Sequence, residues 1–192
     1  KSFIIKIIVL CLVTIKVSAI EKVILFGDSL MAGYGLPKEQ HLSVVLQNSL
    51  ELEGHNIKII NGSVSGSTSA GGLNIAEWTL SENNIDLMIL CLGANDMLRG
   101  INPKETKNNL EEIIKIAKSK NIKIIIAGMI APTSYGFEYK KSFDKIFSDL
   151  SKKHKLQLIP FLLEGVAQKP EFNLSDGMHP NDQGTIIISN TL

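Results

Sequence analysis

Short runs of apolar residues alternate with helix-like segments along most of the chain. Five runs are rich in branched side chains and have the length of strands buried on both faces; they are residues 23–26, 57–60, 86–92, 122–127 and 156–159. Between and after them, apolar spacings of three and four predict helices over residues 42–50, 73–80, 106–118, 143–150 and 181–192. This alternation predicts an α/β fold with a central parallel sheet of about five strands, covered by helices on both faces.

The first 19 residues have the pattern of a secretory signal peptide. Residues 1–6 form a short basic start, residues 7–15 are apolar, and Val17-Ser18-Ala19 resembles a cleavage site of small residues. The apolar stretch is only about nine residues long, whereas a helix that spans a bilayer needs about 20. We therefore expect cleavage after Ala19, no stable membrane anchor afterwards, and a periplasmic or secreted protein. An uncleaved amphipathic anchor is the alternative.

Residues 20–192 are expected to form a single domain. They contain no internal repeat, no low-complexity tract and no composition change that marks a second domain. The last predicted helix reaches Leu192 without a cap or a polar tail, which indicates a truncated C-terminus.

Charge and cysteine content narrow the possible functions. The chain carries 20 basic and 19 acidic residues, a net charge of +1, and cleavage after Ala19 would remove three lysines and leave −2. Without a basic run, neither value suggests a nucleic-acid partner. Cys91 is the one cysteine beyond the cleavage site, and its apolar neighbours indicate a buried packing residue. Because neither metal-ligand spacing nor a phosphate loop occurs, we expect no metal and no cofactor.

A candidate nucleophile follows the first predicted strand. Ser29 lies directly after this strand, and ligands of open α/β sheets collect at the carboxyl ends of the strands. A serine hydroxyl needs a base near neutral pH. His179 follows Asp176 by three residues, so one tight turn lets the carboxylate orient the imidazole and leaves the second ring nitrogen for the serine. We predict Ser29, His179 and Asp176 as nucleophile, base and acid.

The surroundings of Ser29 differ from an α/β-hydrolase elbow, because Met31 stands where the G-x-S-x-G pattern has its second glycine. Residues 63–72, rich in serine and glycine, follow the second strand. They suit a binding loop at the same sheet edge, although a solvated linker has the same composition.

Four short motifs resemble the conserved blocks of the GDSL, or SGNH, hydrolase family. They occur in the family's order and span most of the chain after residue 21. The motifs are Gly27-Asp28-Ser29-Leu30, Ser65-Gly66-Ser67-Thr68, Gly93-Ala94-Asn95-Asp96 and Asp176-Gly177-Met178-His179-Pro180. The resemblance implies a three-layer, flavodoxin-like SGNH hydrolase fold. Ala94 departs from the pattern, since the most similar subgroup often has a second glycine there.

That subgroup comprises bacterial multifunctional acyl-CoA thioesterases that also act as lysophospholipases and arylesterases. Leu98-Arg99-Gly100, Tyr135-Gly136 and Ile159-Pro160-Phe161 resemble it. The resemblance implies a serine esterase that hydrolyses small acyl esters and thioesters through an acyl-enzyme, and we expect a monomer. Two alternatives stay open: a carbohydrate acetylesterase of the same superfamily, and a periplasmic binding module without chemistry.

The resemblance also implies roles for further residues. The oxyanion donors would be the backbone N–H groups of Ser29 and Gly66 and the side-chain amide of Asn95. From their positions after strands, we expect Asp28 and Asp96 to brace their loops by accepting backbone hydrogen bonds rather than to act as the acid. Residues 97–100 and 130–136 would line an acyl groove, although their apolar side chains suit plain packing equally well. The substrate contacts predicted there are Met97, Leu98, Ile130, Pro132 and Tyr135.

Overall fold

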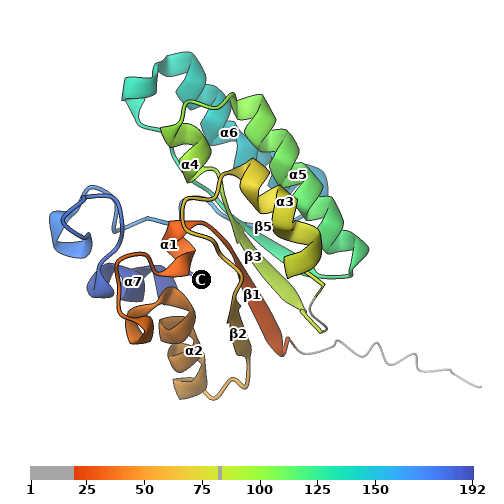
Figure 1. The fold of residues 1–192 in the computed structure, drawn as a ribbon, viewed down its shortest axis with the longest axis vertical. Coiled ribbons are helices and arrows are strands. Elements are labelled where there is room, and N and C mark those ends of the chain that lie inside the picture. Colours follow the sequence, from red (N-terminus) through yellow and green to blue (C-terminus); the bar gives the residue numbers. More distant parts are fainter. Residues whose placement is uncertain (1–19, 82–83) are drawn as a thin grey trace, which may run out of the picture.

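The computed structural model describes residues 20–81 and 84–192, so the predicted signal peptide lies outside the described residues. Strands and helices alternate along this part of the chain (Figure 1). The strands are β1 Lys22–Gly27, β2 Lys58–Asn61, β3 Leu87–Cys91, β4 Lys123–Ala127 and β5 Gln157–Ile159. The α-helices are α1 Ser29–Ala32, α2 Leu42–Leu52, α3 Ser69–Thr79, α4 Ala94–Leu98, α5 Pro103–Ser119, α6 Phe137–His154 and α7 Asp182–Ser189.

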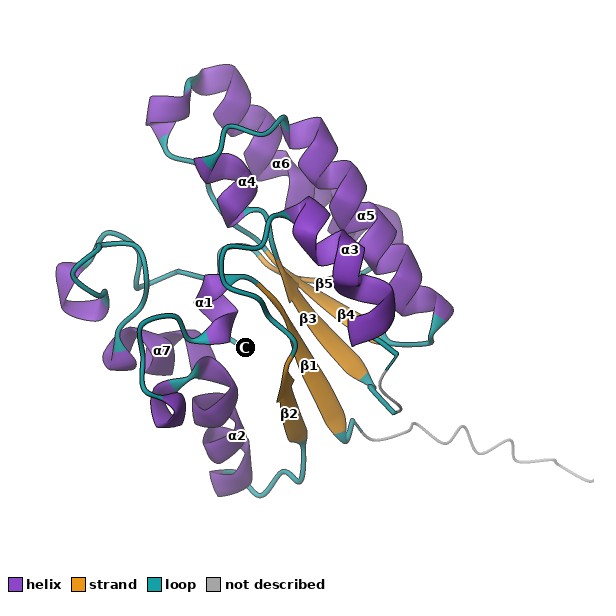
Figure 2. Cartoon of the chain, in the orientation of Figure 1, coloured by secondary structure: helices purple, strands orange, loops and turns teal. Residues whose placement is uncertain are grey.

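The five strands form one parallel sheet in the order β2-β1-β3-β4-β5 (Figure 2). Helices α2 and α7 pack together on one face, and α3, α5 and α6 cover the other (Figure 1). The chain moves outward from β1 to β2 and then returns past β1 to β3, so the direction of winding reverses beside β1. Open α/β sheets bind ligands at the carboxyl ends of the strands next to such a reversal. The predicted three-layer, flavodoxin-like α/β fold is confirmed.

The core lies on both faces of the central strands. Leu25, Leu90 and Ile126, on three neighbouring strands, are fully buried. Helices contribute the apolar stripes that their spacing predicts, namely Leu110, Ile113, Ile114 and Ala117 from α5, and Phe143, Ile146, Phe147 and Leu150 from α6. Cys91 is buried as predicted, and this burial raises the pKa of its thiol.

Helix α3 begins four residues before the predicted start. Its first residue is Ser69, because Thr68 caps the helix by accepting a hydrogen bond at Oγ1 from the N–H of Gly71, 3.1 Å away. The first turn consists of small residues, which carry no apolar signal. The short helices α1 and α4 were also not predicted, and the last helix ends at Ser189 rather than at residue 192.

No helix within residues 20–81 and 84–192 combines the length and the apolar composition needed to cross a membrane.

Candidate active site

Ser29 lies at the carboxyl edge of the sheet, where β1 gives way to helix α1. Asp28 caps this helix by accepting a hydrogen bond from the N–H of Leu30 at 3.1 Å. Only glycine suits position 27, since a Cβ on Gly27 would lie 2.6 Å from the carbonyl oxygen of Cys91 in strand β3. The Gly-Asp-Ser sequence thus turns the chain sharply and holds the Ser29 hydroxyl half-buried at the sheet edge.

Ser29, His179 and Asp176 form one hydrogen-bonded chain. The Nε2 atom of His179 lies 2.9 Å from Ser29 Oγ, and its Nδ1 atom lies 2.6 Å from Asp176 Oδ2. The serine and the histidine are 150 residues apart in the sequence. The fold therefore brings together the three side chains that the sequence predicts as nucleophile, base and acid.

The turn from Asp176 to His179 holds the carboxylate and the imidazole in place. Asp176 Oδ1 accepts hydrogen bonds from the backbone N–H groups of Met178 at 2.9 Å and His179 at 3.0 Å. Partial burial acts to raise the pKa of Asp176, but these N–H groups and the imidazole outweigh it and lower the pKa to about 2. Asp176 is therefore ionised at neutral pH, favours a proton on Nδ1, and leaves Nε2 as an acceptor for the serine proton.

Tyr34, which the sequence did not single out, covers the imidazole. Its ring centroid lies 4.4 Å from that of His179, and the two planes are tilted by 38°. A π face at this distance restricts the imidazole and favours the positive charge that it gains as a base. Tyr34 lies in the loop after α1, so no local spacing connects it with His179.

Gly66 and Asn95 lie after β2 and β3, the two strands that neighbour β1. Gly66 has a φ of +79° and follows Ser65 in a turn that the N–H of Ser67 closes on the carbonyl of Val64 at 3.1 Å. It is exposed, and nothing lies within 4 Å of an added Cβ. Asn95 lies in the first turn of α4. Both predicted donors thus lie at the sheet edge that carries the serine.

A buried carboxylate orients the Asn95 amide. Its Nδ2 atom donates to Asp28 Oδ2 at 3.3 Å, which engages one N–H and leaves the second for another acceptor. Asp28 is fully buried, and burial raises its pKa to about 6, although hydrogen bonds from Leu30 and Asn95 oppose this rise. Asp28 braces both the helix start and the amide, in agreement with its predicted bracing role.

The raised pKa of Asp28 predicts that stability falls as the pH rises. The pKa is about 6 in the folded protein and near 3.8 in the unfolded chain, so the folded state binds more protons between these values. The expected loss between about pH 4 and about pH 6 is on the order of 3 kcal/mol, at about 1.36 kcal/mol per pH unit. Urea unfolding of the native chain and of Asp28→Asn should show a difference that changes over this range. A difference independent of pH would contradict the prediction.

Asp96 joins the segment that follows Gly66 to helix α4, which carries Asn95. Its Oδ2 accepts the N–H of Ser69 at 2.7 Å, and its Oδ1 accepts the hydroxyls of Ser69 at 2.5 Å and Thr106 at 3.1 Å. Asp96 and Ser69 are both fully buried. This network fixes the start of α3 against α4, so Asp96 also has the bracing contacts that the sequence predicts.

Arg99, the only arginine of the sequence, makes a second link at the surface. Its Nη2 atom donates to the carbonyl oxygen of Gly66 at 3.0 Å. Arg99 lies one helical turn after Asn95, at the end of α4. The Gly66 backbone is therefore tied to the same helix that holds the Asn95 amide.

Loss of the hydrogen bond from Arg99 to the Gly66 carbonyl should slow the chemical step of a reaction in which the Gly66 N–H acts as a donor. Arg99→Met is expected to lower kcat roughly 10-fold with little change in KM, because a loosened donor acts mainly in the transition state. Since Arg99 is exposed, guanidinium added below denaturing concentrations should restore part of the lost rate. Steady-state kinetics test this, and an unchanged kcat in Arg99→Met would exclude a catalytic effect of the contact.

The residues predicted to contact substrate lie in two places. In α4, the side chain of Met97 belongs to the core, whereas Leu98 is 51% exposed. In the loop after β4, Ile130 is 44% exposed, Pro132 is exposed, and the half-buried ring of Tyr135 stacks on an aromatic ring of α6. Leu98 and Ile130 therefore present apolar surface, while Met97 and Tyr135 mainly pack against the protein.

Other parts of the described chain contribute little to this site. Within residues 20–81 and 84–192, no group of three or more histidine, cysteine, aspartate or glutamate side chains has a metal-binding arrangement. A surface depression lined by Ile20, Glu21 and residues 54–58 contains none of the predicted site residues.

Comparison of the chain with known protein families gives a match that includes all the candidate site residues described above. The model of the GDSL-like Lipase/Acylhydrolase family matches residues 25–185, which include Ser29, Gly66, Asn95, Asp176 and His179. The chain belongs to the GDSL-like lipase/acylhydrolase family. It is a serine hydrolase, and the resemblance carried by the four short motifs is confirmed.

This GDSL-like hydrolase is similar to its relatives over most of their length. It is 38% identical over 165 residues to an arylesterase of Vibrio mimicus, a match that covers 86% of this chain and 82% of the relative. It is 31% identical over 180 residues to Thioesterase 1/protease 1/lysophospholipase L1 of Escherichia coli K12, with 94% and 85% covered. The crystal structure of TesA superposes with a TM-score of 0.84 at 32% identity, with 89% and 95% covered.

Proposed function

We propose that this hydrolase cleaves acyl esters and thioesters through a covalent acyl-enzyme. Ser29 acts as nucleophile, His179 as general base and Asp176 as the acid that orients the imidazole. The observation that carries the proposal is the unbroken chain of hydrogen bonds, 2.6 Å from Asp176 to His179 and 2.9 Å from His179 to Ser29. A protein that only binds an ester has no need of a base beside a hydroxyl.

In the first half of the reaction, Ser29 Oγ attacks the acyl carbonyl carbon and its proton passes to His179 Nε2. The ionised Asp176 stabilises the imidazolium. The N–H groups of Ser29 and Gly66 and the Asn95 amide donate to the negative oxygen of the tetrahedral intermediate. When the intermediate collapses, the leaving alkoxide or thiolate takes the proton from His179, and the acyl group stays on Ser29.

Water completes the second half. It enters where the alcohol or thiol has left, His179 removes one of its protons, and the oxygen attacks the acyl carbon. A second tetrahedral intermediate forms against the same donors. Its collapse releases the carboxylic acid and returns the proton to Ser29 Oγ, so the enzyme ends in its starting state.

We propose lysophospholipids, acyl-CoA thioesters and simple aryl esters as the substrate class. The names of the Vibrio mimicus and Escherichia coli relatives support this range, and exposed Leu98 and Ile130 offer apolar surface to an acyl chain. We propose further that residues 1–19 are a cleaved signal peptide and that residues 20–192 act as a monomeric enzyme in the periplasm or outside the cell. Lysophospholipids and free esters suit that location better than acyl-CoA.

A hydrolysis panel on the chain from Ile20 onward, with Ser29→Ala as the blank, tests the proposal. The panel comprises p-nitrophenyl esters of increasing chain length, palmitoyl-CoA, a lysophosphatidylcholine and acetylated xylan. We expect turnover that depends on Ser29 and rises with acyl length. Activity on acetyl groups alone would replace the proposal with a carbohydrate acetylesterase. Turnover no higher than in the Ser29→Ala blank would contradict ester hydrolysis altogether.

A further inference from the structure

The charge of the protein is divided unevenly between two parts. Residues 103–155, which form α5, β4 and α6, carry twelve lysines and six acidic residues, a net charge of +6. The other residues from 20 onward carry five basic and thirteen acidic residues, a net charge of −8. Helices α5 and α6 pack against each other on one face of the sheet (Figure 1). The two parts of the chain therefore carry large net charges of opposite sign, although the overall net charge is small.

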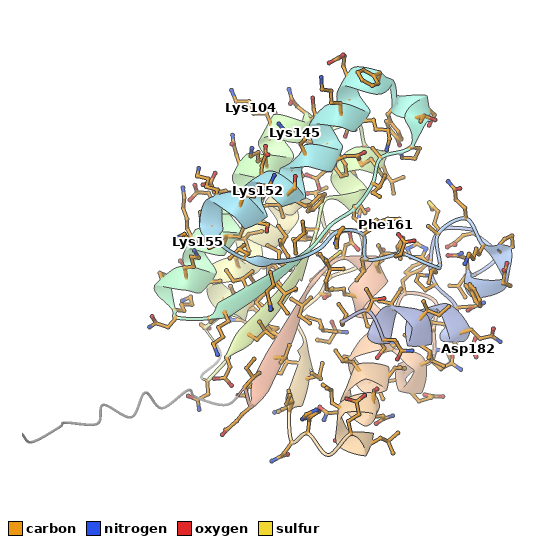
Figure 3. The ribbon with its side chains drawn as sticks, turned by 180° about the vertical axis from the view of Figure 1, so that it is seen from behind. Lys104, Lys145, Lys152, Lys155, Phe161 and Asp182 are labelled. Atoms are coloured by element: carbon orange, nitrogen blue, oxygen red, sulfur yellow. The ribbon has the colours of Figure 1, made fainter. Side chains whose placement is uncertain are left out.

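One side of α6 concentrates the positive charge. Four residues of this helix and its C-cap residue follow one another at spacings of three, four or seven. They therefore form one stripe along the helix. We call them the α6 stripe: Phe137, Lys141, Lys145, Lys152 and Lys155. All five are exposed. Figure 3 shows the lysines that it labels on this stripe, together with Lys104 of α5, along the same side of the molecule.

The lysines of the stripe are poorly neutralised by carboxylates. Lys145 approaches Asp149 only to 4.0 Å, and Lys152 and Lys155 form no ion pair with any residue that the structure describes. By contrast, Lys107 lies 2.8 Å from Asp149, on the side that faces α5. Asp149 thus makes its short ion pair with a lysine outside the stripe, and most of the charge of the stripe stays available to a partner.

Phe137 adds an apolar group at one end of the stripe. It is 73% exposed, and the ammonium of Lys141 lies 5.7 Å from the centre of its ring. An exposed aromatic ring among lysines is typical of segments that lie in a membrane interface. Phe137 follows the loop of Ile130, and the ammonium of Lys140 holds that loop by donating to Ala131 O at 2.7 Å. The apolar end of the stripe therefore adjoins the proposed substrate loop.

Lys104 extends the positive surface beyond α6. It lines one shallow depression together with Glu138, Tyr139 and Ser142 from the first turns of α6. The hydroxyl of Tyr139 donates to the carbonyl of Ile101 at 3.0 Å and so ties the two helix starts together. Lys104 and Phe137 thus belong to the same end of the helix pair.

We propose that the α6 stripe and Lys104 dock this enzyme on an anionic lipid surface. Lysine side chains interact as compact point charges, which suits a diffuse layer of lipid phosphates. Nucleic-acid recognition relies more on arginine, and the one arginine here is bonded to Gly66. Phe137 inserts between the lipids, while the acidic remainder of the molecule is repelled. Docking in this way brings the substrate loop to the surface in which lysophospholipids reside.

Sedimentation with lipid vesicles tests the docking. The chain from Ile20 onward contains every strand, helix and core residue described above, and its binding is measured without substrate, so failure leaves the proposed chemistry untouched. We expect binding to phosphatidylglycerol vesicles, little binding to phosphatidylcholine, and release by about 1 M salt. The variant Lys141→Gln/Lys145→Gln/Lys152→Gln should bind on the order of 100-fold more weakly, because each lysine contributes roughly fivefold near an anionic surface.

A matched variant distinguishes an effect of the α6 stripe on binding from an effect of the protein's net charge. Lys38→Gln/Lys58→Gln/Lys169→Gln removes three exposed lysines from the acidic remainder of the molecule and changes the total charge equally. It should bind the vesicles almost as well as the native chain. Both variants should retain the native rate on a soluble ester, which shows that they fold. An equal loss of binding in the two variants would overturn the proposal.

Tryptophan fluorescence locates the inserted residue. The sequence contains one tryptophan, Trp78, which is 82% exposed on α3. We expect no blue shift of its emission on anionic vesicles, but a clear shift in the double variant Trp78→Phe/Phe137→Trp. A shift from Trp78 in the native chain, or equal binding to neutral vesicles, would overturn the proposal. Tighter binding to duplex DNA than to the vesicles would assign the stripe to nucleic acid instead.

Discussion

The variant His179→Ala is expected to lose at least about four orders of magnitude in kcat, with intact folding. The imidazole of His179 is the one bonded to both Ser29 Oγ and an ionised carboxylate. Without it, the serine hydroxyl keeps its proton and attacks poorly. Turnover of a p-nitrophenyl ester measures the loss, and circular dichroism checks the fold.

His154 supplies a matched control for this experiment. It also pairs with a carboxylate, since its Nε2 lies 3.0 Å from Glu111 Oε1, and its side chain is only 13% exposed. That pair joins α5 and α6, and within the part of the chain that the structure describes no serine hydroxyl bonds to His154. His154→Ala should keep most of the activity, as should His41→Ala and His55→Ala. A loss in His154→Ala comparable to that in His179→Ala would refute the assigned base.

Replacing Asn95 by alanine should lower kcat about 100- to 1000-fold and leave KM nearly unchanged. One N–H of the Asn95 amide bonds to Asp28. The other N–H is left for the substrate, and we expect it to bond most strongly when negative charge develops on the carbonyl oxygen. Asn95→Asp should be worse, because it sets a second carboxylate against Asp28 and offers no donor.

Steady-state kinetics on one ester, with Asn108→Ala of the exposed side of α5 as the control, measure this effect. The control should match the native enzyme. If Asn95→Ala raised KM and kept kcat, the amide would be a ground-state contact rather than an oxyanion donor.

The catalytic candidates could be predicted from the sequence because their signals are local. Ser29 follows an apolar strand, and Asp176 and His179 share one tight turn, so short spacings carry the chemistry. The sheet could be predicted for the same reason, since strands buried on both faces appear as continuous apolar runs.

The contacts that surround these residues depend on long-range packing. Tyr34 meets His179, and Arg99 meets Gly66, across separations that no spacing rule connects. The start of α3 depends on the Thr68 cap and on the buried bridge to Asp96, in a stretch with no apolar periodicity. Met97 was predicted to contact substrate but is buried in the core. The sequence could not decide this, because an apolar residue beside a site motif looks the same whether it packs in the core or faces a substrate.

The separation of 150 residues between Ser29 and His179 has a consequence for synthesis. Every strand of the sheet precedes the turn that carries the imidazole and its carboxylate. A chain grows from its N-terminus, so the sheet and its serine are made well before the base exists. A nascent chain that stops after Ser175 retains all five strands but carries an inert hydroxyl. For an enzyme proposed to act on lipids, translation itself then delays hydrolysis until the turn that carries His179 has been made.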